Sequence, residues 1–219
     1  MTWFIDNFDF IAGLTGKHVV LSVIPIVAGF VIAVPIGWVA SRNVRLRGIL
    51  LGVGGIMYSI PSLPLFVVLP SIIGTGILDP FNVVFALSLY AAALLIRACA
   101  DAFSAVSPEV LDAASAAGYS PAQRFFTVEL PLAGPVLLAG LRVVSVSTVS
   151  LVSIGALIGV SSLGSLFTDG FQRGFGTEIW IGMTLIVLVA LVFDAVLVIL
   201  ARILMPWNSL LTRTARVRA

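Results

Sequence analysis

The sequence predicts an all-α polytopic membrane protein with about five transmembrane helices. Of its 219 residues, 60% are hydrophobic and 10% are charged, whereas a soluble domain carries about 25% charged residues. The mean hydropathy of +1.17 leaves too little polar surface to cover a globule in water. The apolar stretches are long and do not alternate as barrel strands do, so helices are expected to pair the backbone groups inside the lipid.

Five apolar stretches are long enough to cross a hydrocarbon core, which takes about 20 helical residues. They run over residues 18–41, 48–73, 81–106, 135–160 and 178–204. Aromatic residues before the first stretch indicate an interfacial segment, with Trp3, Phe4, Phe8 and Phe10. The sequence shows no internal repeat and no inverted pair of broken segments, so we expect one transmembrane domain over residues 1–219.

The stretch over residues 48–73 contains three prolines, Pro61, Pro64 and Pro70. Each proline removes a backbone donor and disturbs the packing of the preceding helical turn. We therefore expect this helix to bend or unwind near residues 59–64. Irregular backbone at that depth has to be covered by protein or face a watery cavity.

Basic residues predict the orientation of the chain in the membrane. Ten of the twelve fall on one side of the predicted spans: Arg42, Arg45, Arg47, Arg97, Arg124, Arg142, Arg202, Arg213, Arg216 and Arg218. The other side holds Lys17 and Arg173. Because positive charge is retained in the cytoplasm, the N-terminus is expected outside and the C-terminus inside. This arrangement requires an odd number of spans, in agreement with five.

Ionisable residues inside the spans need a partner or water, because a charge at that depth is costly. Asp194 lies well inside the fifth span, and either pairing or a role in transport would explain it. Arg97 and Asp101 share a face of the third span, and Arg142 lies in the fourth. We expect these three residues to form ion pairs within the bundle.

The chain carries no residue pattern typical of a catalytic or metal site. It has one histidine and one cysteine, so neither a metal cluster nor a catalytic triad is expected. We interpret His18 as an anchor at the outer membrane edge and Cys99 as a packed core thiol. Its one lysine, Lys17, does not stand in a phosphate-binding loop, because Ile11 occupies the place of the first glycine. We expect no ATPase activity and no bound cofactor in this chain.

The segment over residues 107–134 is predicted to be a cytoplasmic loop with two short helices. Ser107 can cap the first helix, with Pro108 at its first position and Glu109 near the positive end of the helix dipole. Gly118 then supplies a turn that ends this helix.

The second loop helix is predicted over residues 121–128. Ser120 and Gln123 have the spacing of a capping box. Pro131 and Pro135 are expected to end the loop before the fourth span. A short capped helix can dock in a groove of a soluble partner, or it can be a plain interfacial connector. The residues alone leave both readings open.

The spacing within this loop resembles the pattern found in permeases of ABC importers. That pattern has Glu-Ala-Ala, three residues, Gly, nine residues and then Ile-x-Leu-Pro. This chain has Asp112-Ala113-Ala114, Gly118 and Val128-Glu129-Leu130-Pro131, so it departs from the pattern at residues 112 and 128. Several fixed positions in the expected loop make this a specific match.

A wider resemblance covers residues 18–206 and is to the glycine betaine/carnitine/choline (osmoprotectant) permeases. The motifs that carry it are Tyr58–Phe66, Leu89-Tyr90, Val128–Leu132, Ala139–Arg142 and Ile158–Gly164. Ser161 and Ser162 stand where such permeases often have glycine. The resemblance implies the permease fold of the type I ABC importers.

The resemblance implies that the cytoplasmic loop couples the chain to an ATPase. The implied contact residues are Glu109, Asp112, Ala113, Ala114, Gly118, Pro121, Arg124, Phe125, Phe126, Leu130 and Pro131. Residues that could line the solute pathway are Tyr58, Ser59, Pro61, Ser62 and Tyr90, together with Phe66 and Phe85. The four aromatic ones, Tyr58, Phe66, Phe85 and Tyr90, could equally pack against lipid.

The same resemblance implies a multi-pass protein of the bacterial inner membrane that works in an assembly. Its partners would be two ATPase subunits that bind ATP and Mg²⁺, a second permease chain, identical or a sibling, and an extracytoplasmic binding protein. The small net charge of +2 gives no reason to expect nucleic acid. The solute would be a quaternary-ammonium osmoprotectant. The alternatives are another small solute such as an amino acid, or an ion-coupled carrier that uses Asp194.

Overall fold

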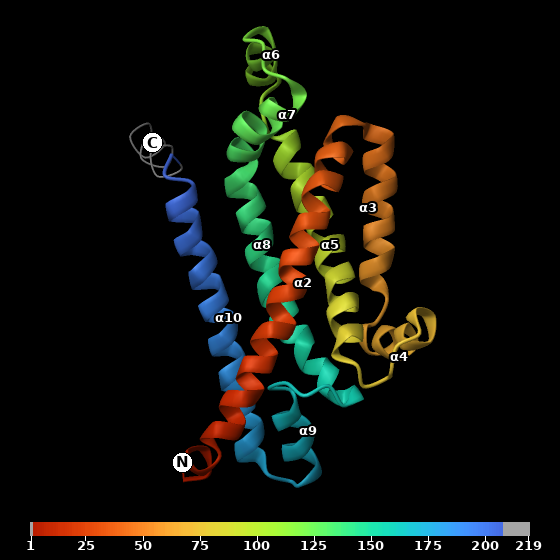
Figure 1. Ribbon diagram of the computed structural model, residues 1–219, viewed down its shortest axis with the longest axis vertical. Helices are drawn as coiled ribbons and strands as arrows, with labels where there is room; N and C mark the ends of the chain where they lie inside the picture. The colour runs from red at the N-terminus through yellow and green to blue at the C-terminus, as the bar shows by residue number, and fades with distance from the viewer. Residues whose placement is uncertain (1, 208–219) are drawn as a thin grey trace.

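The computed structural model describes residues 2–207, which form helices and no strand (Figure 1). The basic tail residues Arg213, Arg216 and Arg218 lie outside this described range. The elements, in chain order, are α1 (Thr2–Asp6), α2 (Phe8–Arg42), α3 (Val44–Ser59), α4 (Ser62–Ile73), α5 (Pro80–Ser104), α6 (Pro108–Ala116), α7 (Pro121–Arg124), η1 (Phe125–Glu129), α8 (Leu130–Val152), η2 (Ser153–Ile158), α9 (Ser165–Gln172) and α10 (Gly176–Leu204).

The described residues contain four helices that are long and apolar enough to cross a membrane. These are Phe8–Arg42, Pro80–Ser104, Pro121–Ile158 and Gly176–Leu204. The bent pair α3–α4 makes a fifth candidate span. The prediction of an all-α fold with about five spans is therefore confirmed. Figure 1 shows the long helices side by side, with α6 and α7 at one end and α9 at the other.

The first span begins ten residues before its predicted start. Residues 8–17 continue α2 rather than forming a separate interfacial segment, so α2 has 35 residues. At 1.5 Å per residue its length is about 52 Å, well beyond a hydrocarbon core of about 30 Å. Hydropathy placed the start too late, because polar residues such as Thr15 and Lys17 interrupt the apolar run without interrupting the helix.

The predicted bend in the second span is confirmed at residues Ile60 and Pro61. Both have extended backbone angles, and α3 and α4 meet there at 100°. The physical cause is Pro61, which disfavours helical geometry at the preceding residue. The freed carbonyl of Ile60 accepts a hydrogen bond of 2.5 Å from the hydroxyl of Tyr90 on α5.

The closest helix contact in the core joins α2 to α5. A Cβ added to Gly29 would stand 2.5 Å from the Cβ of Ala91, and one added to Gly37 would overlap Cys99. Cys99 is fully buried in this contact, as expected. Gly48 and Gly52 on α3, in contrast, have no atom within 4 Å of an added Cβ. The close approach therefore lies between α2 and α5, at two glycines of α2.

The fourth span also begins earlier than predicted, because the helix does not stop at the prolines. Helical backbone continues from Pro121 to Ile158. A π-helical turn over Phe125–Glu129 lies directly before Pro131, with the Leu130 N–H bonded to the Phe125 carbonyl. The wider turn leaves room for a proline ring, which would otherwise crowd the preceding turn. Within the predicted loop of 107–134, non-helical backbone is therefore confined to the residues just before and just after α6.

Polar residues inside the bundle find partners on other helices. Arg142 on α8 donates two hydrogen bonds, of 2.6 and 2.8 Å, to the Asp194 carboxylate on α10. The ion pair expected for Arg142 is therefore formed. His18 is fully buried, and its Nε2 donates to the Val149 carbonyl at 3.0 Å. The prediction that His18 anchors the chain at the membrane edge is therefore wrong, because α2 starts earlier and carries this residue into the core.

Candidate functional site

The helix α6 stands at one end of the molecule, and most of its side chains are exposed (Figure 1). Ser107 precedes it, and its carbonyl accepts from the Val110 and Leu111 N–H groups, but its side chain makes no hydrogen bond to the helix backbone. The Ser107 hydroxyl instead donates to the carboxylate of Glu109. This hydrogen bond lowers the pKa of Glu109 below its ordinary value. Ser107 is therefore the N-cap residue of α6, as predicted, but its hydroxyl is turned to the Glu109 carboxylate and does not cap a backbone N–H.

The turn after α6 depends on a left-handed backbone at Gly118, where φ is +85°. The Gly118 N–H donates to Ser115 and the Tyr119 N–H donates to Ala114, at 3.0 and 3.2 Å. These two bonds satisfy carbonyls at the end of α6, as a glycine-terminated helix requires. The predicted turn is confirmed, and it reverses the chain toward α7.

The second loop helix starts with the predicted capping box. The Gln123 side chain accepts from the Ser120 N–H at 2.9 Å, and the Ser120 hydroxyl accepts from the Gln123 N–H at 3.3 Å. Pro121 occupies the first helical position, where its missing N–H costs nothing. The start of the long helix is therefore set by local chemistry that the sequence already contains.

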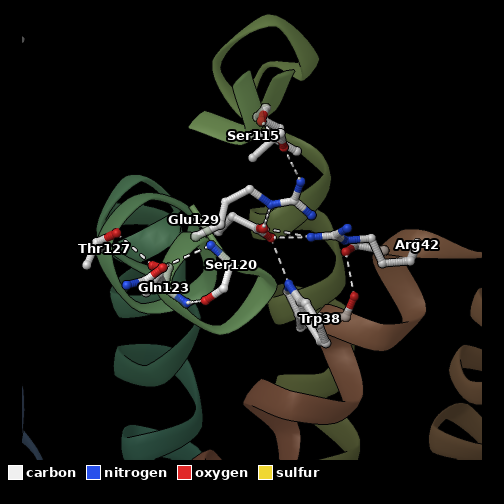
Figure 2. A network of polar contacts seen from close by, with 10 residues as sticks. Trp38, Arg42, Ser115, Ser120, Gln123, Thr127 and Glu129 are labelled. Atoms are coloured by element: carbon white, nitrogen blue, oxygen red, sulfur yellow. Dashed lines mark hydrogen bonds and ion pairs between the residues drawn. The ribbon is translucent and has the colours of Figure 1, made fainter. Parts of the chain in front are cut away.

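A buried carboxylate joins this loop to the end of the first span. Glu129 is 2% exposed. Its oxygens accept from Arg42 at 2.7 Å, from the Trp38 indole at 2.7 Å and from Arg124 at 2.9 Å (Figure 2). Because Trp38 and Arg42 belong to α2, one side chain of the loop is held by a helix some 90 residues earlier.

Arg124 extends the network to α6, because its Nη1 donates to the Ser115 hydroxyl at 2.8 Å (Figure 2). Beneath it, Phe125 packs edge-on against Trp38 and also contacts Phe103 on α5, with ring centroids 5.3 and 5.7 Å apart. Arg42 lies over the Trp38 ring at 4.8 Å. Together these contacts attach the loop to α2 and α5.

The predicted loop residues divide into two groups. Arg124, Phe125 and Leu130 point toward the bundle and are partly buried. Most of the others are exposed on or beside α6 and α7: Glu109, Asp112, Ala113, Gly118, Pro121 and Phe126. Ala114 and Pro131 are intermediate in exposure.

Sequence reasoning did not select Glu129, Trp38 or Arg42 as site residues. A usable signal existed, since Glu129 is the one charged residue between positions 125 and 141. A lone carboxylate in an apolar stretch needs a cationic partner. The identity of that partner could not be read, because it lies far away in the chain.

The candidate pathway residues cluster at the bend between α3 and α4. Tyr58, Ser59 and Pro61 are exposed and Ser62 is partly exposed. Tyr90 is 3% exposed and meets the Tyr58 ring edge-on at 5.9 Å.

The two further aromatic candidates behave differently. Phe66 is fully buried among α4, α5 and neighbouring side chains. Phe85 is exposed and lies against the ring of Phe81.

Polar side chains extend from the bend along one face of α5. Tyr90, Arg97, Asp101 and Ser104 share this face by helical spacing. Asp101 and Ser104 bind Arg47 on α3 at 2.5 and 2.9 Å. Arg97 is exposed and forms no ion pair within residues 2–207. The expected pairing is thus confirmed for Asp101 and Arg142 but wrong for Arg97.

A family model described as "Binding-protein-dependent transport system inner membrane component" matches residues 21–209. An osmoprotectant import permease protein of Salmonella typhimurium, OsmW, is 31% identical over 93% of this chain and 96% of its own length. A glycine betaine/carnitine/choline transport system permease of Bacillus subtilis, OpuCD, is 29% identical over 94% of this chain and 86% of its own.

A third relative joins two functions in one polypeptide. The ergothioneine transport permease/ergothioneine binding protein EgtU of Helicobacter pylori is 36% identical over 75% of this chain. The matched region is 29% of that protein.

Solved structures with the same fold come from two ABC transporters. A chain of the MetNI methionine transporter, in an inward-facing conformation, superposes with a TM-score of 0.71 at 22% identity, over 85% of this chain and 94% of its own. A chain of an amino acid ABC transporter superposes with a TM-score of 0.74 at 15% identity, over 92% and 97%. At these identities the likeness establishes the fold.

Proposed function

Because the chain belongs to the family of binding-protein-dependent transport system inner membrane components and is a permease subunit of an ABC importer, we propose that it carries a quaternary-ammonium osmoprotectant. The observation that carries this proposal is its similarity to OsmW and OpuCD over nearly the whole length of the chain. Glycine betaine, carnitine and choline are the solutes in the name of the second relative. Permease subunits of such importers are not themselves enzymes.

The exposed residues of α6 and α7 form the proposed contact with the ATPase. Ala113 and Ala114 are small, so a partner can approach the helix closely. Phe126 is 66% exposed and offers an aromatic anchor of the kind that dominates interfaces. The turn at Gly118 and the capping box at Ser120 keep the two helices in one geometry, and such preorganisation favours docking.

The proposed assembly contains two ATPase subunits, a second permease chain and an extracytoplasmic binding protein, in a bacterial inner membrane. The second permease chain is a copy of this one or a sibling. ATP and Mg²⁺ are bound by the ATPase, and this chain supplies the pathway. With α6 and α7 on the cytoplasmic side, the N-terminus of α2 lies outside, as the distribution of arginines predicts.

The face that α5 shares with α3 and with the bend between α3 and α4 is the proposed wall of the solute pathway, and we call it the open face. It carries Tyr58, Ser59, Pro61 and Ser62 at the bend, with Tyr90 holding the freed carbonyl of Ile60. An aromatic face attracts a quaternary ammonium group. Arg97 lies on the same face of α5 as Tyr90 and is suited to a carboxylate. We therefore expect zwitterionic solutes, such as glycine betaine, to pass this wall more readily than choline, which has no carboxylate.

The test is reconstitution of the permease in liposomes with its ATPase and binding protein. Uptake of radiolabelled glycine betaine should require ATP and the binding protein, and Arg97→Gln should lower uptake of glycine betaine more than uptake of choline. ATP-driven uptake of an amino acid alone would refute the osmoprotectant proposal. Equal effects of Arg97→Gln on both solutes would remove Arg97 from the pathway.

The same liposomes test the rival mechanism of an ion-coupled carrier. Asp194 already has a bidentate partner in Arg142, so we assign it a structural role. Asp194→Asn should leave the number of solute molecules transported per ATP unchanged. Uptake that is driven by an ion gradient without ATP, and is lost in Asp194→Asn, would support the carrier instead.

A further inference from the structure

We propose that Glu129 is a positioning residue that makes the loop helices and α2 move as one body, so that motion imposed on α6 reaches the outer end of α2. The inference rests on the proposed function, because it concerns how an ATPase acts on this chain. It adds a residue outside the exposed contact surface, and it assigns transmission rather than docking to that residue.

The hydrogen bonds of Glu129 come from two separate parts of the chain. One carboxylate oxygen accepts from Arg42 and Arg124, and the other accepts from Arg42 and Trp38. Figure 2 shows the Glu129 carboxylate facing the Arg42 guanidinium, with the Trp38 indole below it. Both oxygens are therefore occupied by donors, and each donor group is fixed in direction.

The network extends from α6 through the rest of the loop to α2. Arg124 connects Glu129 to Ser115 near the end of α6. Phe125, four residues before Glu129, packs against Trp38 on the same side. A force applied to α6 thus meets a continuous path of polar and aromatic contacts into α2, and energetic coupling travels through such contiguous networks.

The charge balance makes Glu129 the one essential member of this network. Arg42 and Arg124 are both cationic, and Glu129 is the only carboxylate with which either forms an ion pair within the described residues. A neutral side chain at position 129 would leave two cationic side chains, 38% and 19% exposed, without the carboxylate between them. The attraction that holds the loop to α2 would be lost, and the two like charges would repel, so the junction would loosen.

The rest of α2 packs against its neighbours at several points, so a displacement of its cytoplasmic end can reach its outer end. Gly29 and Gly37 press α2 against α5 without intervening side chains. Farther along, His18 bonds the Val149 carbonyl on α8. A helix fixed at these points moves with its neighbours as a rigid body, which is how importers of this architecture can switch between two arrangements.

The decisive variant is Glu129→Gln, which keeps the size of the side chain and removes its charge. The matched control is Asp9→Asn, because Asp9 is an exposed carboxylate in the first turn of α2, at the other end of that helix from the junction and outside the proposed contact surface. Each permease is reconstituted with its ATPase and binding protein, and both ATP hydrolysis and solute uptake are measured. We expect Glu129→Gln to retain the bound ATPase and its hydrolysis but to lower uptake per ATP by about tenfold, within the usual range of coupling between sites.

A distance measurement separates transmission from general damage. Spin labels at Ala116 on α6 and Val20 on α2, in a Cys99→Ser background, report whether the two elements move together. In the otherwise unchanged chain, the distance distribution should stay narrow and constant when ATP binds. In Glu129→Gln it should broaden or shift with ATP, whereas Asp9→Asn should match the reference.

Each outcome decides the inference. Normal uptake per ATP in Glu129→Gln, or loss of ATPase binding from that variant, would overturn it. If Glu129→Gln fails to accumulate in the membrane, Trp38→Phe serves in its place, because it removes one hydrogen bond and keeps both ion pairs; unchanged uptake per ATP there would also overturn the inference. If the unaltered complex shows no ATP-driven uptake, the proposed function fails before the role of Glu129 arises.

Discussion

The two halves of the molecule are held together in different ways. In the closed half, α2 packs against α5 through glycines, and Glu129 is bound by three side chains. In the open half, α3 meets α5 at Gly54, where an added Cβ would stand 3.2 Å from the Ala93 carbonyl oxygen. It also meets α5 near its two ends, through the Arg47–Asp101 ion pair and the Tyr58–Tyr90 ring contact. Among the described residues, the buried polar junction of the closed half has no counterpart there, in line with our proposal of a transmitting half and a half that lines the pathway.

The largest expected effect tests the closed half at Glu129. Glu129→Leu removes the shared acceptor of Arg42, Arg124 and Trp38. The two arginine side chains are 38% and 19% exposed, so water reduces the penalty, and we expect a loss of about 2–3 kcal/mol of stability. Thermal unfolding of the purified chain in detergent measures it. A loss below 1 kcal/mol would mean that water enters the junction and that the two halves do not differ there.

The next effect compares glycines on the two halves. Gly37→Ala places a methyl group against Cys99, and such overpacking costs about 1–3 kcal/mol. Gly52→Ala meets no atom and should be neutral or stabilising by up to about 1 kcal/mol, because alanine favours the helix. The same unfolding assay compares the two variants. Equal losses would contradict the division into a closed and an open half.

A smaller effect is expected at the bend of the open half. Tyr90→Phe removes the hydroxyl that binds the Ile60 carbonyl, with a cost of about 0.5–1.5 kcal/mol. Hydrogen exchange at residues 59–65 should rise while exchange in α2 stays unchanged. Faster exchange throughout the chain would instead show that the bend supports the whole bundle.

The smallest effect is expected at the end of α3. Asp101→Asn breaks the ion pair with Arg47, in which the two side chains are 52% and 34% exposed. Exposed pairs contribute about 0.2–1 kcal/mol, and salt screens them. The loss should shrink further in high salt. A loss equal to that of Glu129→Leu would place a second rigid junction in the half described as open.

Some elements could be predicted closely from the sequence. The spans expected at 81–106 and 178–204 became α5 (Pro80–Ser104) and α10 (Gly176–Leu204), because their apolar runs coincide with the helices. The bend at Pro61 and the capping box at Ser120 were also predictable, since proline and capping side chains act within a few residues.

Other boundaries could not be predicted, because a helix can continue past the signals that usually end it. The span expected at 18–41 became α2 (Phe8–Arg42), and the one expected at 135–160 is part of a helix from Pro121 to Ile158. In the second case a π-helical turn accommodates Pro131. Hydropathy reports which residues prefer lipid, and that preference is only part of what sets the length of a helix.

The sequence by itself determined that this chain is helical, that it belongs in a membrane and where it bends. These properties depend on composition and on residues within a few positions of one another. Only the tertiary structure decided that Glu129 meets Arg42 and Trp38, that His18 is buried and that Arg97 has no ion pair within residues 2–207. Those contacts join residues that lie far apart in the chain, and their geometry exists only after the helices have packed.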